Sequence, residues 1–359
     1  MSSTPIAPFA CTYNPQLPEL LTKLGCSIAI STYQAGKIIF LSPKNQDALI
    51  QLPRSFDKPM GLAIHPTKDK MAVATKDEVI VLANSAELAT HYPKAPSKYD
   101  AMYMPRTTYH TAGLDLHDIH FGQFNGQEKL FAVNTLFSTI VSLDDDYSFT
   151  PFWSPPQITK LESTDACHLN GLALVNGLPK YATSFNQGNQ PQSWRENIIE
   201  TGTLYDIEKN EVILDNLAMP HSPKMINNEL YLLQSATGEL VKVNPENKTT
   251  ELIYKFKGFV RGLSHYKDYL FVGLSKIRKN SSTFAKLPFV DDAQEAGIYV
   301  IHLPTRSMVG KVTYQSSVDE IYEIQVLSQK LRPNILNTMT QDYKGGLMTP
   351  ETTFWSKIN

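Results

Sequence analysis

Short apolar and β-branched runs separated by turn residues recur along most of the 359-residue chain, and this pattern limits the fold more than any other feature. The runs follow one another at roughly 8–12 residue spacing, which is typical of an all-β sandwich, barrel or propeller. Long amphipathic helices are not evident, apart from a short candidate at 16–24. Clear strand-like runs include CSIAIST, GKIIFLS, KMAVAT, EVIVLAN, KLFAVNT, ELYLLQS, YLFVGLS and GIYVIHL.

Internal similarity selects a propeller from these classes. The segments 59–84, 168–186, 220–246 and 260–276 share one order: a small or polar residue, an apolar strand, a tight turn and further strands ending in Ser, Thr, Asn or Asp. They recur every 40–59 residues, the range of a four-stranded propeller blade. The pattern predicts six innermost strands, which begin near Met60, His117, Asn170, His221, Arg261 and Glu320.

The ring is expected to close through the C-terminal part of the chain. The strand VDEIYEIQVL has no complete blade after it, and the segment 25–55 has no innermost strand before it, so pairing the two removes an open sheet edge. We therefore predict one domain over 1–359, with an N-terminal arm at 1–24, blades over 25–340 and a tail at 341–359. A seven-bladed propeller or an irregular sandwich stays open. Three segments are expected to be long loops: 93–113, 187–200 and 277–296.

The six aligned positions form a predicted polar ring around the central channel. They are Met60, His117, Asn170, His221, Arg261 and Glu320. Strict alternation places the residues two further along in the next layer, which is almost entirely apolar: Leu62, Ile119, Leu172, Pro223, Leu263 and Tyr322. Buried charge and imidazole need partners, so a polar ring above an apolar layer indicates a site, unless the ring side chains satisfy one another around channel water.

The second strands end near the same mouth of the channel and supply a cup of hydrogen-bonding groups. Their ends carry Tyr33, Lys76, Asn134, Ser184, Asn186, Gln234, Ser235, Ser275 and Lys276. In the stretch CHLNG, Asn170 lies in the ring and His168, two residues earlier, is expected higher at the mouth. Cys167 is expected to point away into packing as an inert thiol.

Composition excludes some partners. The formal net charge of −2 gives no basic surface for nucleic acid or an anionic membrane, and no apolar run reaches the ~18–20 residues of a membrane span. The N-terminus lacks the charged and apolar regions of a secretory signal, and the three cysteines lack metal-ligand spacing. These features predict a cytoplasmic protein without a nucleotide cofactor, because no phosphate-cradling glycine loop is present.

The order of several motifs resembles a family of bacterial conserved hypothetical proteins classed as a domain of unknown function. The motifs are LDLHDIHFG, CHLNGLAL, MPHSPKM, FVRGLSHY, VGLSKIR and VDEIYEI, and the resemblance covers nearly the whole chain. More distantly, the chain looks like gluconolactonase/regucalcin-type six-bladed propellers, which hold a divalent metal at the channel mouth. That second resemblance implies a metal near Glu320 and Asn170, with His117 and His221 replacing oxygen ligands.

Imidazole ligands change the expected metal. Calcium prefers oxygen ligands, whereas two His and one carboxylate suit Zn, Fe, Mn or Cu, so the expected transition-metal ligands are His117, His221 and Glu320. Catalytic roles then fall to Arg261, Asn170 and His168, and ligand-binding roles to Asn134, Tyr33, Ser184, Gln234 and Lys276.

Three functions remain open from the sequence. The first is a metal-dependent enzyme, hydrolytic (lactonase-like) or oxidative, acting on a small anionic or polar substrate. The second is a metal-free protein that binds a small molecule through Arg261 and the cup. The third is a scaffold whose rim binds a protein partner.

Overall fold

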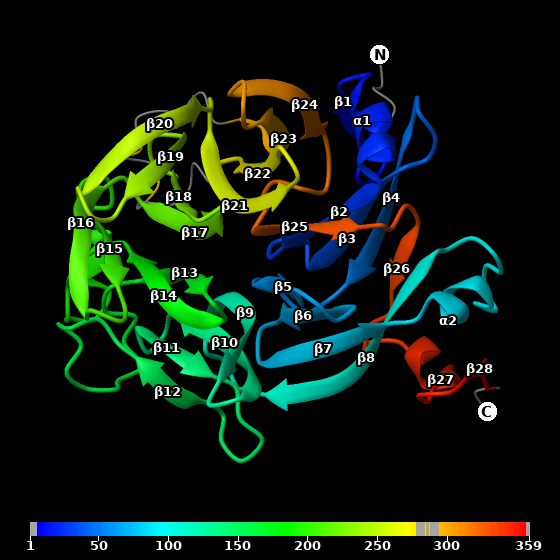
Figure 1. Cartoon of the computed structure of the whole chain (residues 1–359), viewed down its shortest axis with the longest axis horizontal. Coiled ribbons are helices and arrows are strands. Elements are labelled where there is room, and N and C mark those ends of the chain that lie inside the picture. The colour runs from blue at the N-terminus through cyan, green and yellow to red at the C-terminus, as the bar shows by residue number, and fades with distance from the viewer. Residues whose placement is uncertain (1–5, 278–283, 285–286, 288–293, 357–359) are drawn as a thin grey trace.

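The computed structural model describes residues 6–277, 284, 287 and 294–356. Six sheets, each with four antiparallel strands that form a blade, stand around a central axis, so the predicted six-bladed β-propeller is confirmed (Figure 1). A small two-stranded hairpin, β27 (Gly346–Met348) and β28 (Thr353–Trp355), lies outside the ring. None of the described helices is long and apolar enough to cross a membrane.

Each blade runs outward from its innermost strand. The first consists of β25 (Glu323–Ser328), β2 (Cys26–Thr32), β3 (Lys37–Pro43) and β4 (Leu49–Ser55). The second consists of β5 (Leu62–Ile64), β6 (Lys70–Ala74), β7 (Glu78–Asn84) and β8 (Ala101–His110), and the third of β9 (Leu116–Phe124), β10 (Gln127–Asn134), β11 (Thr139–Ser142) and β12 (Thr150–Trp153).

The remaining three blades follow the same order. The fourth consists of β13 (Leu169–Val175), β14 (Leu178–Ser184), β15 (Gly202–Asp206) and β16 (Glu211–Leu217). The fifth consists of β17 (Pro220–Ile226), β18 (Glu229–Gln234), β19 (Glu239–Asn244) and β20 (Thr249–Lys255), and the sixth of β21 (Phe259–Tyr266), β22 (Tyr269–Ser275), β23 (Ala296–His302) and β24 (Ser307–Tyr314).

The ring closes as expected through the C-terminal strand. β25 pairs antiparallel with β2 from Glu323–Ser31 to Ser328–Cys26, so it completes the first blade from the inside. Two short strands add further ties that the sequence did not predict. β1 (Cys11–Tyr13) extends the outer edge of the sixth blade on β24, and β26 (Pro333–Ile335) runs parallel to β8 at the edge of the second. β1 and β26 therefore cover the outer edges of the sixth and second blades, the two neighbours of the first blade. We call the place where the sixth blade meets the first the closing seam.

The predicted short helix is α1 (Leu17–Leu24). It has Pro18 in its first turn and ends at Gly25 in the left-handed conformation (φ +70°), where glycine is favoured. Its buried leucines pack against strands of the first and sixth blades, which places the arm over the closing seam.

The prediction of a long loop at 93–113 is wrong for its second half. Residues 101–110 form β8, which pairs with β7 along its length, and α2 (Ala86–Thr90) lies just before it. The broken alternation of AMYMPRTTYH hid this strand, since its first five residues are all buried. In the second long segment, 187–200, the structure has a short 3₁₀ turn, Ser193–Arg195, and the third segment, 277–296, lies mostly outside the described residues.

Neighbouring blades are joined by side-chain hydrogen bonds to backbone near the channel mouth. A Ser or Thr at the end of the second strand donates to a carbonyl beside the next innermost strand in four places: Ser31 to Met60, Thr135 to Leu169, Ser235 to Val260 and Ser275 to Ile321. The recurring strand-end hydroxyl of the repeat therefore serves first to tie blades together.

Several innermost strands have an irregular register where the predicted ring residues lie. Pairing skips from Leu169 to Gly171 in β13 and from Val260 to Leu263 in β21, which leaves Asn170 and Arg261 in bulges. Bulges break the two-residue alternation and re-aim side chains, often beside functional sites. Glycine is needed here: a Cβ on Gly171 would come within 2.4 Å of Pro223 Cδ in the next blade.

Candidate functional site

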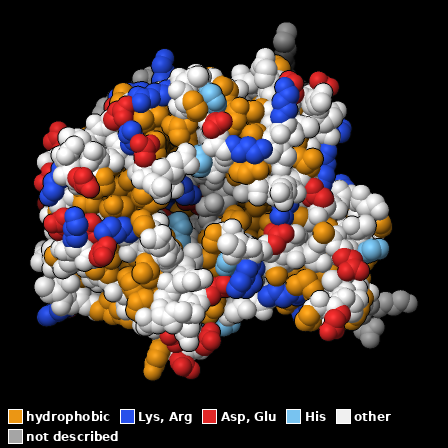
Figure 2. Space-filling model, viewed as in Figure 1, with side chains coloured by type: hydrophobic (Ala, Val, Ile, Leu, Met, Phe, Trp, Pro, Cys, Tyr) orange, Lys and Arg blue, Asp and Glu red, His pale blue; other side chains and the backbone are white. Residues whose placement is uncertain are grey.

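A cavity of about 150 Å³ opens at the mouth of the channel, over the fourth, fifth, sixth and first blades. Figure 2 shows this face hollowed near its centre, where His and basic side chains meet apolar ones. The lining residues are Gln34, His168, Phe185, Met219, His221, Phe259, Arg261, Ser275, Lys276, Ile277, Phe284 and Glu320. Three of the six predicted ring residues, His221, Arg261 and Glu320, therefore line a cavity on one side of the channel mouth.

Arg261 supplies positive charge to the cavity. Its guanidinium carbon lies 3.4 Å from the centroid of the Tyr322 ring, a cation–π contact that fixes the side chain. Among the described residues, no ion pair includes Arg261. By contrast, Lys276 is paired with Asp319 at 2.6 Å (Nζ to Oδ1). Of the two described Lys and Arg side chains that line the cavity, Arg261 is therefore the one that can meet an anion without first breaking an ion pair.

His221 is buried, and its tautomer is determined by its neighbours. Ser235 Oγ donates to the carbonyl of Val260 at 2.5 Å, so this hydroxyl can only accept from His221 Nδ1, 2.7 Å away. The carbonyl of Met219, 3.2 Å from the same nitrogen, also demands a donor. Burial, together with the nearby charge of Arg261, holds the pKa of His221 well below its usual range. The ring is therefore neutral, with its proton on Nδ1 and a lone pair on Nε2.

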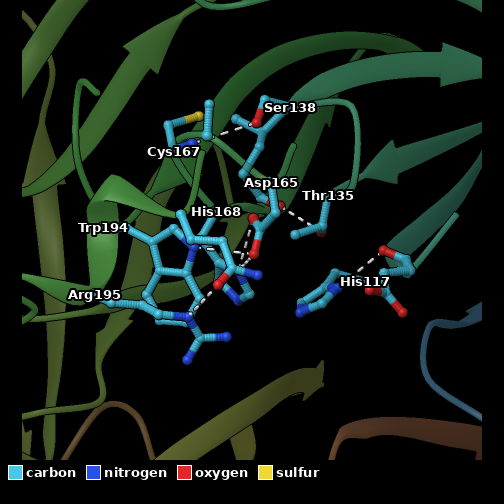
Figure 3. Close-up of polar contacts among 12 residues, drawn as sticks. His117, Thr135, Ser138, Asp165, Cys167, His168, Trp194 and Arg195 are labelled. Atoms are coloured by element: carbon cyan, nitrogen blue, oxygen red, sulfur yellow. Dashed lines mark hydrogen bonds and ion pairs between the residues drawn. The ribbon is translucent and has the colours of Figure 1, made fainter. Parts of the chain in front are cut away.

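His168 is held by a carboxylate. Its Nδ1 lies 3.1 Å from both oxygens of Asp165, which also accepts from Trp194 Nε1 at 3.0 Å. The imidazole packs against Phe185, with ring centroids 4.5 Å apart, and against Trp194, at 4.3 Å, and these two rings also contact each other at 5.4 Å. Figure 3 shows His168, Asp165 and Trp194 grouped together, with Arg195 over the indole. Because a carboxylate only accepts, Nδ1 carries the proton and Nε2 is left for a ligand.

His117 adjoins this group from the third blade. Its ring meets that of His168 edge-on at 4.9 Å and that of Tyr322 at 5.6 Å. Its Nδ1 donates to the carbonyl of Asp115 at 3.0 Å (Figure 3). Burial, with the nearby His168 and Arg261, holds the pKa of His117 well below its usual range, so this imidazole is also neutral.

The structure brings together only part of the predicted site. His168, His221, Arg261, Lys276 and Glu320 line the cavity, and His117 adjoins it. Tyr33 lies beside Tyr322, with ring centroids 6.4 Å apart. Asn170 is buried, and its Oδ1 accepts from Thr183 at 2.7 Å.

Seven of the nine predicted cup residues are not among those that line this cavity, and three of the seven hydrogen-bond within their own blades. Asn134 Oδ1 accepts from the Phe137 amide, and Ser184 donates to the carbonyl of Asn186. Gln234 accepts from the Ala218 amide and donates to Glu239. Met60, the apolar member of the ring, is buried and is not among the lining residues.

Sequence reasoning missed the residues that orient the histidines. Asp165 stands three residues before His168, a spacing that was visible in STDACH, but a lone carboxylate in a loop carries little signal. The sequence pattern placed Tyr322 in the apolar layer below the polar ring, which is one layer too deep. It contacts Arg261 and His117, because the chain before β25 is irregular and does not alternate. Cys167 is fully buried and burial raises its pKa to about 12, in agreement with an inert thiol.

The expected metal ligands do not form one cluster here. Within the described ranges, no group of three or more His, Cys, Asp or Glu side chains is arranged to hold a metal ion. His221 and Glu320 line the cavity, whereas His117 contacts His168 at its side. A transition metal therefore stays a proposal.

Fold and site together define a six-bladed β-propeller with a histidine- and arginine-lined cavity at the channel mouth. The chain belongs to the family described as Domain of unknown function (DUF4915), whose model matches residues 15–336. This agrees with the resemblance seen in the motifs.

Two solved structures share the fold at low identity. One is from a nidogen/laminin complex, with 12% identity, a TM-score of 0.54, and coverage of 85% of this chain and 99% of that one. The other is a protein of unknown function from Bacteroides caccae, with 10% identity, a TM-score of 0.52, and coverage of 84% and 98%. At this identity the likeness shows the fold alone.

One curated protein is similar over a limited stretch. Vacuolar protein sorting-associated protein 20 of Saccharomyces cerevisiae is 30% identical over 147 residues, which is 39% of this chain. The match spans 62% of the length of that protein.

Proposed function

We propose that the chain is an enzyme that takes a small organic anion into the channel-mouth cavity and uses His168 as its acid–base group. The observation that carries the proposal is Arg261, a cation fixed on Tyr322 at the cavity wall and outside every ion pair of the described residues. A guanidinium in this setting binds a carboxylate or phosphate in a directed, charge-assisted way.

The neutral histidines support the same assignment. Charged imidazoles beside Arg261 would repel one another, and burial keeps His117 and His221 uncharged. An anion in the cavity therefore meets the guanidinium of Arg261, while the neutral imidazoles of His117 and His221 offer it no competing positive charge.

His168 has the arrangement of a general base. Asp165 holds Nδ1–H, so Nε2 accepts a proton from the ligand, and the carboxylate stabilises the imidazolium that forms. Asp165 acts here as a positioning residue through His168. Phe185 and Trp194 pack against the imidazole and restrict its orientation.

Calorimetric binding of a panel of small carboxylates, phosphates and their neutral analogues tests the anion site. We expect Arg261→Met to weaken anion binding at least tenfold, while Arg106→Met on the exposed face of β8 leaves it unchanged. Anions that bind equally to both variants would overturn the assignment. For compounds that bind, turnover by wild type and by His168→Gln then tests the acid–base role. Binding of an anion without turnover at any pH would contradict the enzymatic role and leave a protein that only binds the anion.

A second candidate is a metal-dependent enzyme with Zn, Fe, Mn or Cu held by His117, His221 and Glu320. Its support is that His117 and His221 both donate Nδ1–H to fixed acceptors, the arrangement that orients Nε2 toward a metal. Elemental analysis of untagged protein prepared without chelator tests it. Near-stoichiometric metal that His117→Ala and His221→Ala lose, and that the exposed His110→Ala keeps, would favour this candidate. Protein that contains no metal and takes none up on titration would remove it.

A further inference from the structure

The cavity contains an acceptor that requires a donor from its ligand. The hydroxyl of Ser235 donates a hydrogen bond to the Val260 carbonyl, and His221 Nδ1–H donates to Ser235 Oγ and the Met219 carbonyl. The imidazole of His221 lines the cavity, and the lone pair on its Nε2 is then left to accept a hydrogen bond from a ligand there. A ligand that excludes water from the cavity without offering an O–H or N–H leaves this buried acceptor unsatisfied, which is costly.

The walls around His221 are aromatic. Phe185 meets the imidazole edge-on at 5.1 Å and Phe259 at 5.9 Å, and Phe284 lies 5.9 Å from Phe259. Met219 and Ile277 complete the apolar lining. These residues come from the fourth to sixth blades, and Arg261 lies among them on β21. A ligand here pairs an anionic end with an apolar body.

The size of the cavity limits that body. A space of about 150 Å³ accommodates one benzene-sized ring with small substituents. Disaccharides and nucleotides are too large to be enclosed. Short polar acids leave the phenylalanine side chains of the wall in contact with water, so binding gains no free energy from burying that apolar surface.

We infer that the ligand of this cavity is a compact hydroxy acid with an aromatic or branched apolar body. Its carboxylate binds Arg261, its hydroxyl donates to His221 Nε2, and its body lies against Phe185 and Phe259. This inference rests on the proposed anion site and adds the hydroxyl and the apolar body to it.

Mandelate is the probe, compared with three compounds that each lack one feature. Phenylacetate lacks the hydroxyl, 1-phenyl-1,2-ethanediol lacks the carboxylate, and lactate lacks the ring. We expect calorimetry to rank mandelate first, with at least a tenfold loss for each compound that lacks a feature. Arg261→Met should weaken mandelate and phenylacetate alike. His221→Leu should bring mandelate down to the affinity of phenylacetate.

A measurement on the wild type covers the case in which His221→Leu does not fold. Long-range ¹H–¹⁵N NMR reports the protonation and hydrogen bonding of each imidazole nitrogen. We expect the His221 Nε2 resonance to shift on adding mandelate and to stay in place on adding phenylacetate.

The outcomes separate the two proposals. If mandelate and phenylacetate bind equally and both depend on Arg261, the hydroxy-acid inference fails while the anion site stands. The same holds if lactate or a sugar acid binds better than mandelate. If no anion binds in an Arg261-dependent way, the proposed function itself fails.

Discussion

The guanidinium of Arg261 on β21 lies 3.4 Å from the ring centroid of Tyr322, which leads into the strand that closes the propeller. The contact joins the sixth blade to the first across the closing seam. It also holds Arg261, which is in no ion pair of the described residues, in one place, so ring closure and the proposed anion site share a residue pair.

Replacing Tyr322 should therefore change ligand affinity. Tyr322→Leu removes the aromatic face under Arg261, and we expect anion binding to weaken about 2- to 30-fold, the range of a cation–π contact. Tyr322→Phe keeps the ring and serves as the matched control. Calorimetry with the best-binding anion measures both. Equal losses in the two variants would assign the effect to the hydroxyl instead of the ring.

The hydrogen bonds between blades should appear in stability. Thr135→Val keeps the shape of the side chain but leaves the Leu169 carbonyl of the next blade without its donor, so we expect a loss of about 1–3 kcal/mol in the free energy of unfolding. Thr12→Val, on an exposed position of β1, should change it by less than about 0.5 kcal/mol. Chemical denaturation measures both. Similar values for the two variants would contradict a role for these bonds in holding blades together.

The close approach of innermost strands predicts a steric effect at Gly171. A Cβ there would meet Pro223 Cδ at 2.4 Å and Thr183 Oγ1 at 2.5 Å, so Gly171→Ala should destabilise the fold by about 1–3 kcal/mol. Gly113→Ala is the control, because no atom lies within 4 Å of a Cβ at that position. Thermal unfolding of the two variants decides the point, and an unchanged transition for Gly171→Ala would show that the blades separate easily.

A buried carboxylate deeper in the channel predicts how stability depends on pH. Burial raises the pKa of Glu323 to about 7, with Asp118 raising it further and Lys224 and His120 opposing the rise. The folded state therefore binds a proton that the unfolded state releases, so this residue's contribution is complete below about pH 4.5 and is lost as the pH rises through 7. We expect Glu323→Gln to gain stability relative to wild type between pH 5 and 8.

The measurement is the difference in unfolding free energy between wild type and Glu323→Gln at each pH. Taking the difference cancels the contribution of the histidines, which both proteins share. Glu295→Gln, on a partly exposed carboxylate, provides the control. A difference that does not vary with pH would show that Glu323 titrates as it does in the unfolded chain.

The repeat made the propeller predictable, but the bulges hid part of the site. Apolar runs and strand-end Ser, Thr and Asn residues recur at fixed places because every blade meets its neighbour in the same way. Asn170 and Arg261 lie in bulges, which break the two-residue alternation of side chains. A sequence can assign residues to layers of the channel only where that alternation is kept. Tyr322 was misplaced for the related reason that its segment is irregular before β25 begins.

The second-strand hydroxyls show another limit. From the sequence, Ser235 and Ser275 belong to a ligand-binding cup, yet both donate to backbone of the adjoining blade. A strand-end hydroxyl has the same pattern for either use, and only the position of the next blade distinguishes them. Asp165 was missed because its partners, His168 and Trp194, meet it through loop geometry that has no periodicity.

Closure by β25 has a consequence for synthesis. β2 leaves the ribosome early, but 290 residues separate its last residue, Thr32, from Glu323, where its inner partner begins. The second to sixth blades become complete one after another during that interval, while the first blade keeps an unpaired inner edge until its end. Such an edge is a template for misassembly between polypeptides, so newly made chains should depend on chaperones until the last strand emerges.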